Sequence, residues 1–291
     1  PPSRAALRRS GRRSCHNSPV HYRERPPLPE LADFIERIWT LEGHAAPGDG
    51  PQPVMPDGRP ELVLHFGTPF KLVSAAGHEA RQSSILFVGQ LRSRLLLRPD
   101  GPIAIVGIRF HPHGAAALLR VPQHELAGAP IGLDTLHPGL RRALAAIEPG
   151  SGALDAAARD AQRVLAAWLD RDRIDRRVSH AVALLAGTRG RLPIDRVATS
   201  SGLTRRHLER RFLDQVGLTP KRFARVMRFQ HALRLLDQPD AASGGAHAAA
   251  ECGFADQAHF ARDFRELAGC PPSQHLLRKA ELTGFFIAAS V

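Results

Sequence analysis

Basic and acidic side chains recur at helical spacing within residues 201–220, SGLTRRHLERRFLDQVGLTP. Arg206, Glu209 and Arg210 stand at i, i+3 and i+4, so in a helix they share one face. Arginine can bond guanine bidentately in the major groove, and a glutamate can accept from the amino group of cytosine. The spacing therefore favours recognition of DNA bases, while the alternative interpretation is an ordinary solvated helix face.

Two elements must position that face, and the sequence predicts both as helices around a tight turn. Apolar residues at i, i+3 and i+4 predict the first helix: Ile194, Val197 and Ala198. Gly202 can end this helix in the left-handed conformation, and Thr204 is a good N-cap for the next. Leu208 and Phe212 give the second helix an apolar face that can pack on the first. Such a pair, with its second helix held outward, fits a major groove.

The same pattern returns in residues 251–272, ECGFADQAHFARDFRELAGCPP. Four positions recur 52 residues later, namely Leu208 as Phe260, Phe212 as Phe264, Gly217 as Gly269, and Pro220 as Pro272. Gly202 recurs as Gly253 after 51 residues. A repeated supersecondary unit with matching turn residues makes the DNA interpretation stronger than a single copy does.

A long helix is predicted between the two copies, in residues 219–239, TPKRFARVMRFQHALRLLDQP. Thr219 can cap it, Pro220 suits its first turn, and Pro239 follows its end. We predict phosphate contacts from its basic first half and from the start of the preceding helix, by Thr204, Arg205, Lys221, Arg222 and Arg225. For each of these residues a solvated basic face is about as good an interpretation.

Residues 190–278 resemble the DNA-binding domain of AraC-family (AraC/XylS-type) transcriptional regulators. The resemblance rests on IDRVATSSGLTRRHLERRFLDQVGLTPKRFARVMRFQHALRLL and ECGFADQAHFARDFRELAGCPPSQHL, and on the spacing of their Gly, Phe and Pro residues. It implies seven helices with two helix-turn-helix units and a linking helix, whose recognition helices enter successive major grooves about 34 Å apart. The positions that it places against bases are Arg206, Glu209 and Arg210 in the first unit, and Gln257, Ala258 and Arg262, with His259 adjacent, in the second.

The second unit departs from this pattern. Gly245 and Ala248 stand where the first copy has larger aliphatic residues. Glycine in a helix interior costs about 1 kcal/mol relative to alanine, and alanine buries less apolar surface than an aliphatic residue. Ala258 offers bases only a methyl group. We therefore predict that the first unit supplies most of the base readout, and that Arg262 and Gln257 are the best contacts of the second.

The formal net charge of +12 is unevenly distributed along the 291 residues. Residues 187–291 carry 16 Lys/Arg and 10 Asp/Glu, residues 1–25 carry 7 and 1, and residues 26–186 carry 17 of each. The positive field therefore belongs to the proposed DNA-binding part and to the N-terminal segment. A neutral middle part has no electrostatic reason to bind DNA, which suits a sensory role.

The sequence gives little indication of export, of disulfide bonds or of membrane insertion. The first 19 residues are rich in Arg, Ser and Pro and lack an apolar stretch, which indicates a disordered basic tail rather than a secretory signal. Cys15, Cys252 and Cys270 form neither a disulfide framework nor a metal-binding spacing. No apolar run is long enough to span a bilayer. We expect a cytoplasmic bacterial protein without membrane contact.

The N-terminal half reads as short strands divided by Gly and Pro turns. The candidate strands are residues 36–43, 61–67, 70–76, 84–90, 93–99 and 103–112, and the turn MPDGRP occupies 55–60. This pattern predicts a barrel or sandwich. Helical patterns follow in residues 113–121, 138–148, 153–170 and 173–187.

This half also resembles, more loosely, the N-terminal domain of a group of uncharacterised AraC-type regulators. The matching stretches are VMPDGRPELVLHFG, FVGQ and VGIRFHPHGAAALL, within roughly residues 20–135. The resemblance implies a cupin-like β domain of sensory type and names no effector. Strand residues that could line an effector pocket are Trp39, His65, Gln90 and Arg109.

A metal site is the alternative for this half. His65, His111 and His113 lie on or near predicted strands, where histidines can bind a metal. Pro112 separates the last two, however, and no glutamate stands at close spacing. We therefore favour histidines with structural or surface roles, and we predict no metal, no cofactor and no enzymatic activity.

Together these patterns predict an α+β chain with two domains: an N-terminal β-rich barrel or sandwich (cupin-like) followed by helices, and a C-terminal all-α domain with two helix-turn-helix units joined by a linking helix. The predicted boundaries are a disordered tail (1–19), a sensory or dimerisation domain (20–135), a helical connector (136–187), the DNA-binding domain (188–280) and a C-terminal tail (281–291). The predicted function is sequence-specific transcriptional regulation. The expected partners are double-stranded DNA, a small-molecule effector, a second copy of the chain and, for an activator, RNA polymerase. The alternatives are a cupin-type metalloenzyme fused to a DNA-binding module and a nucleoid-type protein without sequence preference.

Overall fold

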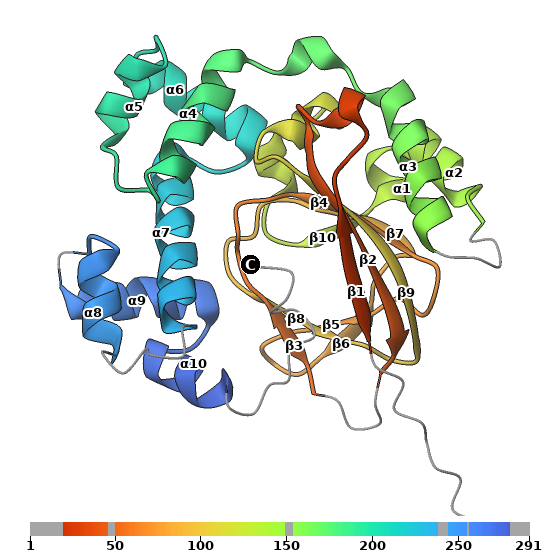
Figure 1. Cartoon of the computed structure of the whole chain (residues 1–291), viewed down its shortest axis with the longest axis horizontal. Coiled ribbons are helices and arrows are strands. Elements are labelled where there is room, and N and C mark those ends of the chain that lie inside the picture. The colour runs from red at the N-terminus through yellow and green to blue at the C-terminus, as the bar shows by residue number, and fades with distance from the viewer. Residues whose placement is uncertain (1–19, 46–49, 149–153, 238–243, 255, 280–291) are drawn as a thin grey trace, which may run out of the picture.

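A computed structural model describes residues 20–45, 50–148, 154–237, 244–254 and 256–279. Figure 1 shows two parts, a β-rich part with its own helices and an all-helical part. The tails predicted at 1–19 and 281–291, together with Cys15, lie outside the described residues. Among the helices of the described residues, none combines the length and the hydropathy that a bilayer span requires.

The β-rich part contains two antiparallel sheets. The larger sheet has the order β1 (His21–Arg25), β2 (Ile35–His44), β9 (Pro102–Phe110), β4 (Glu61–His65), β7 (Ile85–Val88) and β10 (Pro130–Gly132). The smaller has the order β3 (Gln52–Val54), β8 (Leu95–Arg98), β5 (Lys71–Val73) and β6 (Glu79–Arg81). The predicted barrel or sandwich is therefore built as two separate sheets.

The larger sheet is the middle layer of this part, because its strands bury both faces. Along β4, Leu62 and Leu64 point to one core, and Val63 points to another. The first core lies against helices α1 (Leu133–Leu136), α2 (Pro138–Ala145) and α3 (Leu154–Trp168), and the second includes Leu97 of the smaller sheet and Phe70, which precedes β5. Alternation of side chains along a strand produces both contacts.

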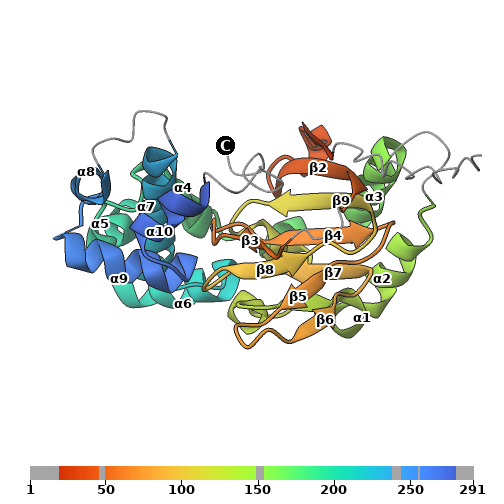
Figure 2. The same cartoon turned by 90° about the horizontal axis from the view of Figure 1, so that it is seen from below.

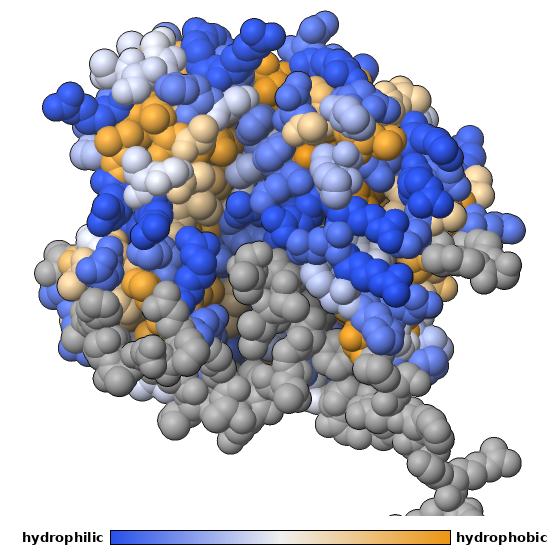
Figure 3. All heavy atoms as spheres, in the orientation of Figure 1, coloured by the Kyte–Doolittle hydropathy of each residue, from blue (hydrophilic) through white to orange (hydrophobic). Residues whose placement is uncertain are grey.

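Strand β1 closes one edge of the larger sheet, and its outward side chains are mostly exposed. Figure 3 shows that the surface over β1 and β2 is hydrophilic. Charged side chains on an edge strand discourage pairing with another strand. These side chains therefore disfavour the pairing of a further strand with the outer side of β1.

The helical part is built around one long central helix, α7 (Pro220–Leu236). The others are α4 (Arg176–Gly187), α5 (Ile194–Ser200), α6 (Arg205–Val216), α8 (Gly244–Glu251), α9 (Gln257–Ala268) and α10 (Pro272–Lys279). Phe212 of α6 packs on Phe223 with ring centroids 5.5 Å apart, and Phe264 of α9 packs on Phe229 at 5.2 Å. Helix α7 therefore carries one helix-turn-helix unit near each of its ends (Figure 1).

The six predicted strands are all present, as β2, β4, β5, β7, β8 and β9. Four further strands, β1, β3, β6 and β10, were not predicted. The helix predicted at 113–121 is only a 3-10 turn, Gly114–Ala117. The segment 136–187, predicted as a connector, divides its packing: α2 and α3 lie in a core of the β-rich part, and α4 lies in the core of the helical part.

Candidate nucleic-acid interface

The first helix-turn-helix unit comprises α5 and α6. Gly202 has φ +64°, which turns the chain at the end of α5. Thr204 then caps α6 by accepting from the backbone N–H of His207 at 3.3 Å, as predicted. Leu208 and Phe212 are fully buried. The opposite face of α6 is left to solvent by this packing.

The predicted base-reading residues of this unit, Arg206, Glu209 and Arg210, are all exposed on α6. Arg205 forms ion pairs with Glu209 at 3.1 Å and with Asp195 of α5 at 3.2 Å. In the free protein the carboxylate of Glu209 is thus held by a neighbour. Arg206 and Arg210 are therefore the exposed basic side chains through which we expect this face to contact DNA first.

The second unit, α8 and α9, follows the same construction. Asp256 caps α9 by accepting from the backbone N–H of His259 at 2.6 Å. Helix α9 has 12 residues, like α6, and begins 52 residues after it. Gly253 takes φ +70°, as Gly202 does in the first unit. The repeat seen in the sequence is therefore a repeat of caps, helix length and turn geometry.

The outward face of α9 differs from that of α6. Gln257, Ala258 and Arg262 are exposed, and His259 is half-buried against the ring of Phe254 at 5.5 Å. Figure 2 shows α6 and α9 on the same side of the helical part. All of the predicted base-facing positions thus lie on two helices that are presented in one direction.

The predicted phosphate contacts divide into exposed and ion-paired residues. Lys221 is exposed at the start of α7. Arg225 bonds Asp263 at 2.8 Å and Glu266 at 2.5 Å, and Arg222 approaches Glu266 at 3.5 Å. Burial opposes ionisation of Arg225, but the two carboxylates outweigh it and raise its pKa. Arg225 therefore fastens α7 to α9, and phosphate contact by any of the five residues stays a prediction.

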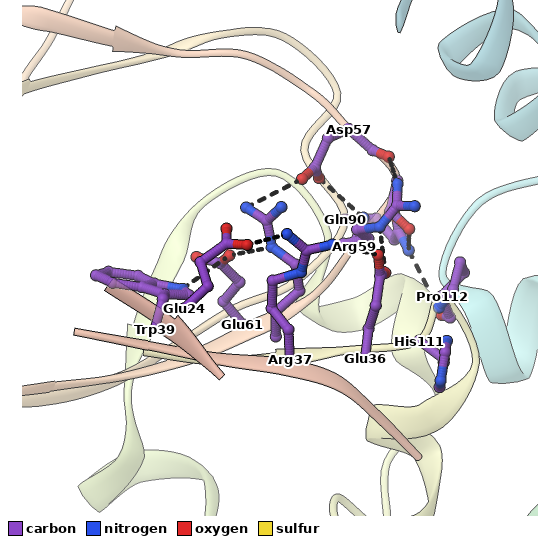
Figure 4. Close-up of polar contacts among 12 residues, drawn as sticks. Glu24, Glu36, Arg37, Trp39, Asp57, Arg59, Glu61, Gln90, His111 and Pro112 are labelled. Atoms are coloured by element: carbon purple, nitrogen blue, oxygen red, sulfur yellow. Dashed lines mark hydrogen bonds and ion pairs between the residues drawn. The ribbon is translucent and has the colours of Figure 1, made fainter. Parts of the chain in front are cut away.

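The predicted effector residues lie in two places. Trp39 and Arg109 meet at Glu61, whose Oε1 accepts from Trp39 Nε1 at 3.3 Å and from Arg109 Nε at 2.7 Å (Figure 4). Burial alone would lower the pKa of Arg109, but Glu61 and Asp57, the latter at 3.4 Å, raise it above its usual value. Gln90 donates to the carbonyl of Gly58 at 2.9 Å.

His65 lies elsewhere, with its ring 5.4 Å from that of Phe70. Burial lowers its pKa to about 4, so it is neutral at pH 7. His111 and His113 stack at 6.1 Å. Nowhere in the described part of the chain do three or more His, Cys, Asp or Glu side chains gather as a metal site would require.

Contacts between the two parts of the molecule were missed by the sequence reasoning. Arg94 donates its backbone N–H to the carbonyl of Leu267, near the end of α9, at 2.8 Å. Gln230 of α7 donates to the carbonyl of Pro56 at 2.6 Å. Because the acceptors are backbone carbonyls, which every residue has, the sequence carried no signal for where these donors would bind.

Comparison with known proteins gives two family matches. Residues 197–278 match a helix-turn-helix domain, and residues 23–131 match a domain of unknown function (DUF6597). None of the curated proteins compared with the chain matches it.

Three solved structures illustrate the likeness. A probable AraC family transcriptional regulator from Rhodopseudomonas palustris CGA009 is 30% identical over 36% of this chain and 97% of its own, with a TM-score of 0.34. The DNA-binding domain of AdpA, solved with a target DNA, is 24% identical over 37% of this chain and 97% of its own, with a TM-score of 0.33. ToxT from Vibrio cholerae is 12% identical over 85% of this chain and 99% of its own, with a TM-score of 0.45.

The family assignment rests on sequence, namely on the 30% identity that spans nearly all of the first of these chains and on the helix-turn-helix match. Both fall on the part of the molecule where the repeated helix pairs lie. This chain is a DNA-binding transcriptional regulator and belongs to the AraC family.

Proposed function

We propose that the chain binds promoter DNA with both helix-turn-helix units, α6 and α9 entering successive major grooves on one face of the duplex. The observation that carries this proposal is the repeat itself: two 12-residue helices with matching caps, each with an exposed outward face, on one side of the helical part. One turn of B-DNA separates successive grooves by about 34 Å. A second, weaker interface at α9 would then add affinity and fix the register of the first.

The charge distribution supports this division of labour. Residues 187–291 carry the positive excess, 16 Lys/Arg against 10 Asp/Glu, whereas residues 26–186 carry 17 of each. Attraction to phosphates supplies most sequence-independent affinity for DNA. The helical part therefore holds the duplex, and the β-rich part is left free for another role.

That role is the sensing of a small effector or self-association. The partly buried polar cluster around Glu61 and Arg109 supports it, because charged groups held in place on a β domain provide fixed partners for a polar ligand. An effector acts on DNA binding only if it favours one arrangement of the protein over another. RNA polymerase is a further partner if the bound protein activates transcription.

The test is a binding selection from a random duplex library with the full-length protein, followed by a salt titration on the selected site. The proposal expects information in two patches about one helical turn apart, and a preference of about 10³ or more over random DNA. Binding that depends steeply on salt but enriches no sequence would overturn sequence-specific regulation. A single enriched patch would overturn the use of both units.

A further inference from the structure

The two recognition helices touch the β-rich part at equivalent points. The glycine that ends α6 is Gly217, and the glycine that ends α9 is Gly269; both have positive φ, +89° and +68°. A Cβ on Gly217 would lie 2.8 Å from the carbonyl oxygen of Gln123, and a Cβ on Gly269 would lie 2.5 Å from Nε of Arg94. Each repeat therefore presents its C-terminal glycine to a different loop of the β-rich part.

At α9 the contact completes the helix end. The last carbonyls of a helix lack partners within the helix, and the backbone N–H of Arg94 supplies one to Leu267 at 2.8 Å. The guanidinium of Arg94 lies against Gly269, where the negative end of the helix dipole attracts a cation. A residue of the β-rich part thus serves as a C-terminal cap for the second recognition helix.

At α6 the contact is made by the 3-10 turn Gln123–Leu126 and by the segment that precedes α4. His124 lies 3.9 Å from Asp214 of α6. Gln215 accepts from the backbone N–H of Asp175 at 3.1 Å and donates to the carbonyl of Arg173 at 2.9 Å. The end of the first recognition helix is therefore held on two sides.

A third contact lies between these two, on the linking helix. The turn 55–59 packs on α7: a Cβ on Gly58 would lie 2.7 Å from Cε of Met227. Gln230, which is 6% exposed, donates to the carbonyl of Pro56 at 2.6 Å. Within the β-rich part, the polar cluster of Figure 4 holds the turn in place. Gln90 donates to the carbonyl of Gly58 at 2.9 Å, and Arg109 forms an ion pair with Asp57 at 3.4 Å.

These contacts close a ring that runs from α6 through the β-rich part to α9 and back along α7. With α7 alone, each unit would rest on a single shared helix, at Phe223 and Phe229. A closed ring resists relative motion of the two units better than one shared helix does.

We infer that Arg94, Gln123 and the turn 55–59 are positioning residues, which hold both recognition helices in one relative placement and so set the half-site spacing that the protein accepts. The consequence for spacing rests on the proposed function; the placement of the helices does not.

The direct test measures the distance between the two helices without DNA. Spin labels are placed at the exposed positions His207→Cys on α6 and Arg265→Cys on α9, in a Cys15→Ser background. The remaining thiols, Cys252 and Cys270, are buried. The variant Arg94→Ala/Gln230→Met removes the cation at the end of α9 and the bond to Pro56. Arg92→Ala is the matched control, because it removes an exposed arginine from the same loop.

A narrow distance distribution that broadens in Arg94→Ala/Gln230→Met, but not in Arg92→Ala, is the expected result. An unchanged distribution would overturn the inference. A circular dichroism melt of each protein checks that the variant is folded, and Gly58→Ala, which pushes the turn off α7, serves as a second variant with the same expected result.

The DNA arm uses duplexes in which the two selected half-sites are moved apart or together by one base pair. In the wild type each change should cost about fivefold or more in affinity, which is the lower end of ordinary coupling energies. In the double variant the penalty should nearly vanish. An equal penalty in both proteins contradicts the inference. If the wild type selects no two-patch site, the proposed function fails, and the distance measurement alone decides the placement of the helices.

Discussion

The two helix-turn-helix units share a frame but differ in what they present to DNA. With an offset of 52 residues, Arg206 corresponds to Ala258 and Glu209 to Ala261, and of the predicted base contacts only Arg210 keeps its residue type, as Arg262. The caps, the helix length and the terminal glycine are shared, because they decide whether the helix forms and where it ends. The outward face is free of those constraints, so we expect the difference to reflect a division of labour in base readout.

The supporting helices differ in the same sense, and the core compensates. Helix α8 begins at Gly244, so Gly245 lies in its first turn, where a glycine costs less than in the helix interior that the sequence suggested. The smaller side chain of Ala248 is offset by Phe254, which contacts Phe260 at 5.1 Å between ring centroids. Phe254 thus adds an aromatic contact to the core of the second unit, and we expect the weakness of this unit to lie in readout rather than in packing.

Truncation of the central phenylalanine of each unit should produce the largest effect. Phe212→Ala and Phe264→Ala should each lower the free energy of unfolding by about 3–5 kcal/mol. Phe264→Ala should be the costlier, because its ring meets three others, those of Phe229, Phe260 and His275 at 5.2, 5.6 and 5.6 Å. Urea denaturation of the full-length protein measures both. A larger loss for Phe212→Ala would show that the aromatic core does not compensate.

Arginine truncations test the asymmetry in readout. Arg206→Ala and Arg210→Ala should each weaken binding to the selected duplex by about 1–3 kcal/mol and relax specificity at one position. Arg262→Ala should cost less, because its neighbours on α9 include alanines. Arg196→Ala is a control that removes an exposed arginine from α5. Fluorescence anisotropy titrations on matched and mismatched duplexes give the values, and a cost for Arg262→Ala above the other two would refute the asymmetry.

The elements could be predicted from the sequence wherever periodicity was strong. The recognition helices and the four central strands of the larger sheet, β2, β9, β4 and β7, have the pattern that their packing requires, since buried faces repeat at a period of 3.6 or 2. Strand β1, HYRER, was missed because its outward residues are polar and it lies next to a basic tail. Strands β3, β6 and β10 have only three residues each, too few for a period to show.

The candidate site could be predicted only in part, for a different reason. Exposure of Arg206 and Arg210 follows from helical spacing alone. That Arg225 pairs with Asp263 depends on how α7 crosses α9, which spacing does not report. The capping of α9 by the backbone of Arg94 had no signal at all, because any residue except proline has an N–H to donate. Pattern reasoning finds faces, and it misses the partners that tertiary packing brings to them.

The outward face of α6 carries Glu209, and the corresponding position of α9 is Ala261, so this pair of positions gives a further comparison of the two units. Glu209→Gln removes a negative charge near the phosphates and releases Arg205, which pairs with it at 3.1 Å. We expect tighter binding to random DNA, by no more than about 1 kcal/mol, since exposed pairs contribute little. Discrimination at the base that Glu209 faces should fall. Ala261→Glu makes the reverse change in α9, and titrations at two salt concentrations should show weaker random binding. Equal effects of both changes on the selected site would mean that the two faces read DNA equally.

The loss of stability in acid should differ between the ion pairs that anchor the two units, and this is the smallest of the expected effects. Asp175 faces Arg211 of α6, and Glu266 faces Arg225 beside α9. Burial raises the pKa of Asp175, but Arg177 and Arg211 lower it below its usual value. A hydrogen bond from Arg225 lowers the pKa of Glu266 despite some burial.

A carboxyl whose pKa is lowered in the folded state stabilises the protein above its unfolded pKa, and this stabilisation is lost as the pH falls through the folded value. Neither anchor should therefore change stability between pH 7 and pH 5, and both should weaken below about pH 4. The loss should be smaller for Glu266, whose side chain is 50% exposed against 11% for Asp175, so that screening leaves it well under about 1 kcal/mol. Urea denaturation of Asp175→Asn and Glu266→Gln across this range measures each contribution, and a larger acid loss through Glu266 would show that the second unit depends on its anchor more than the first.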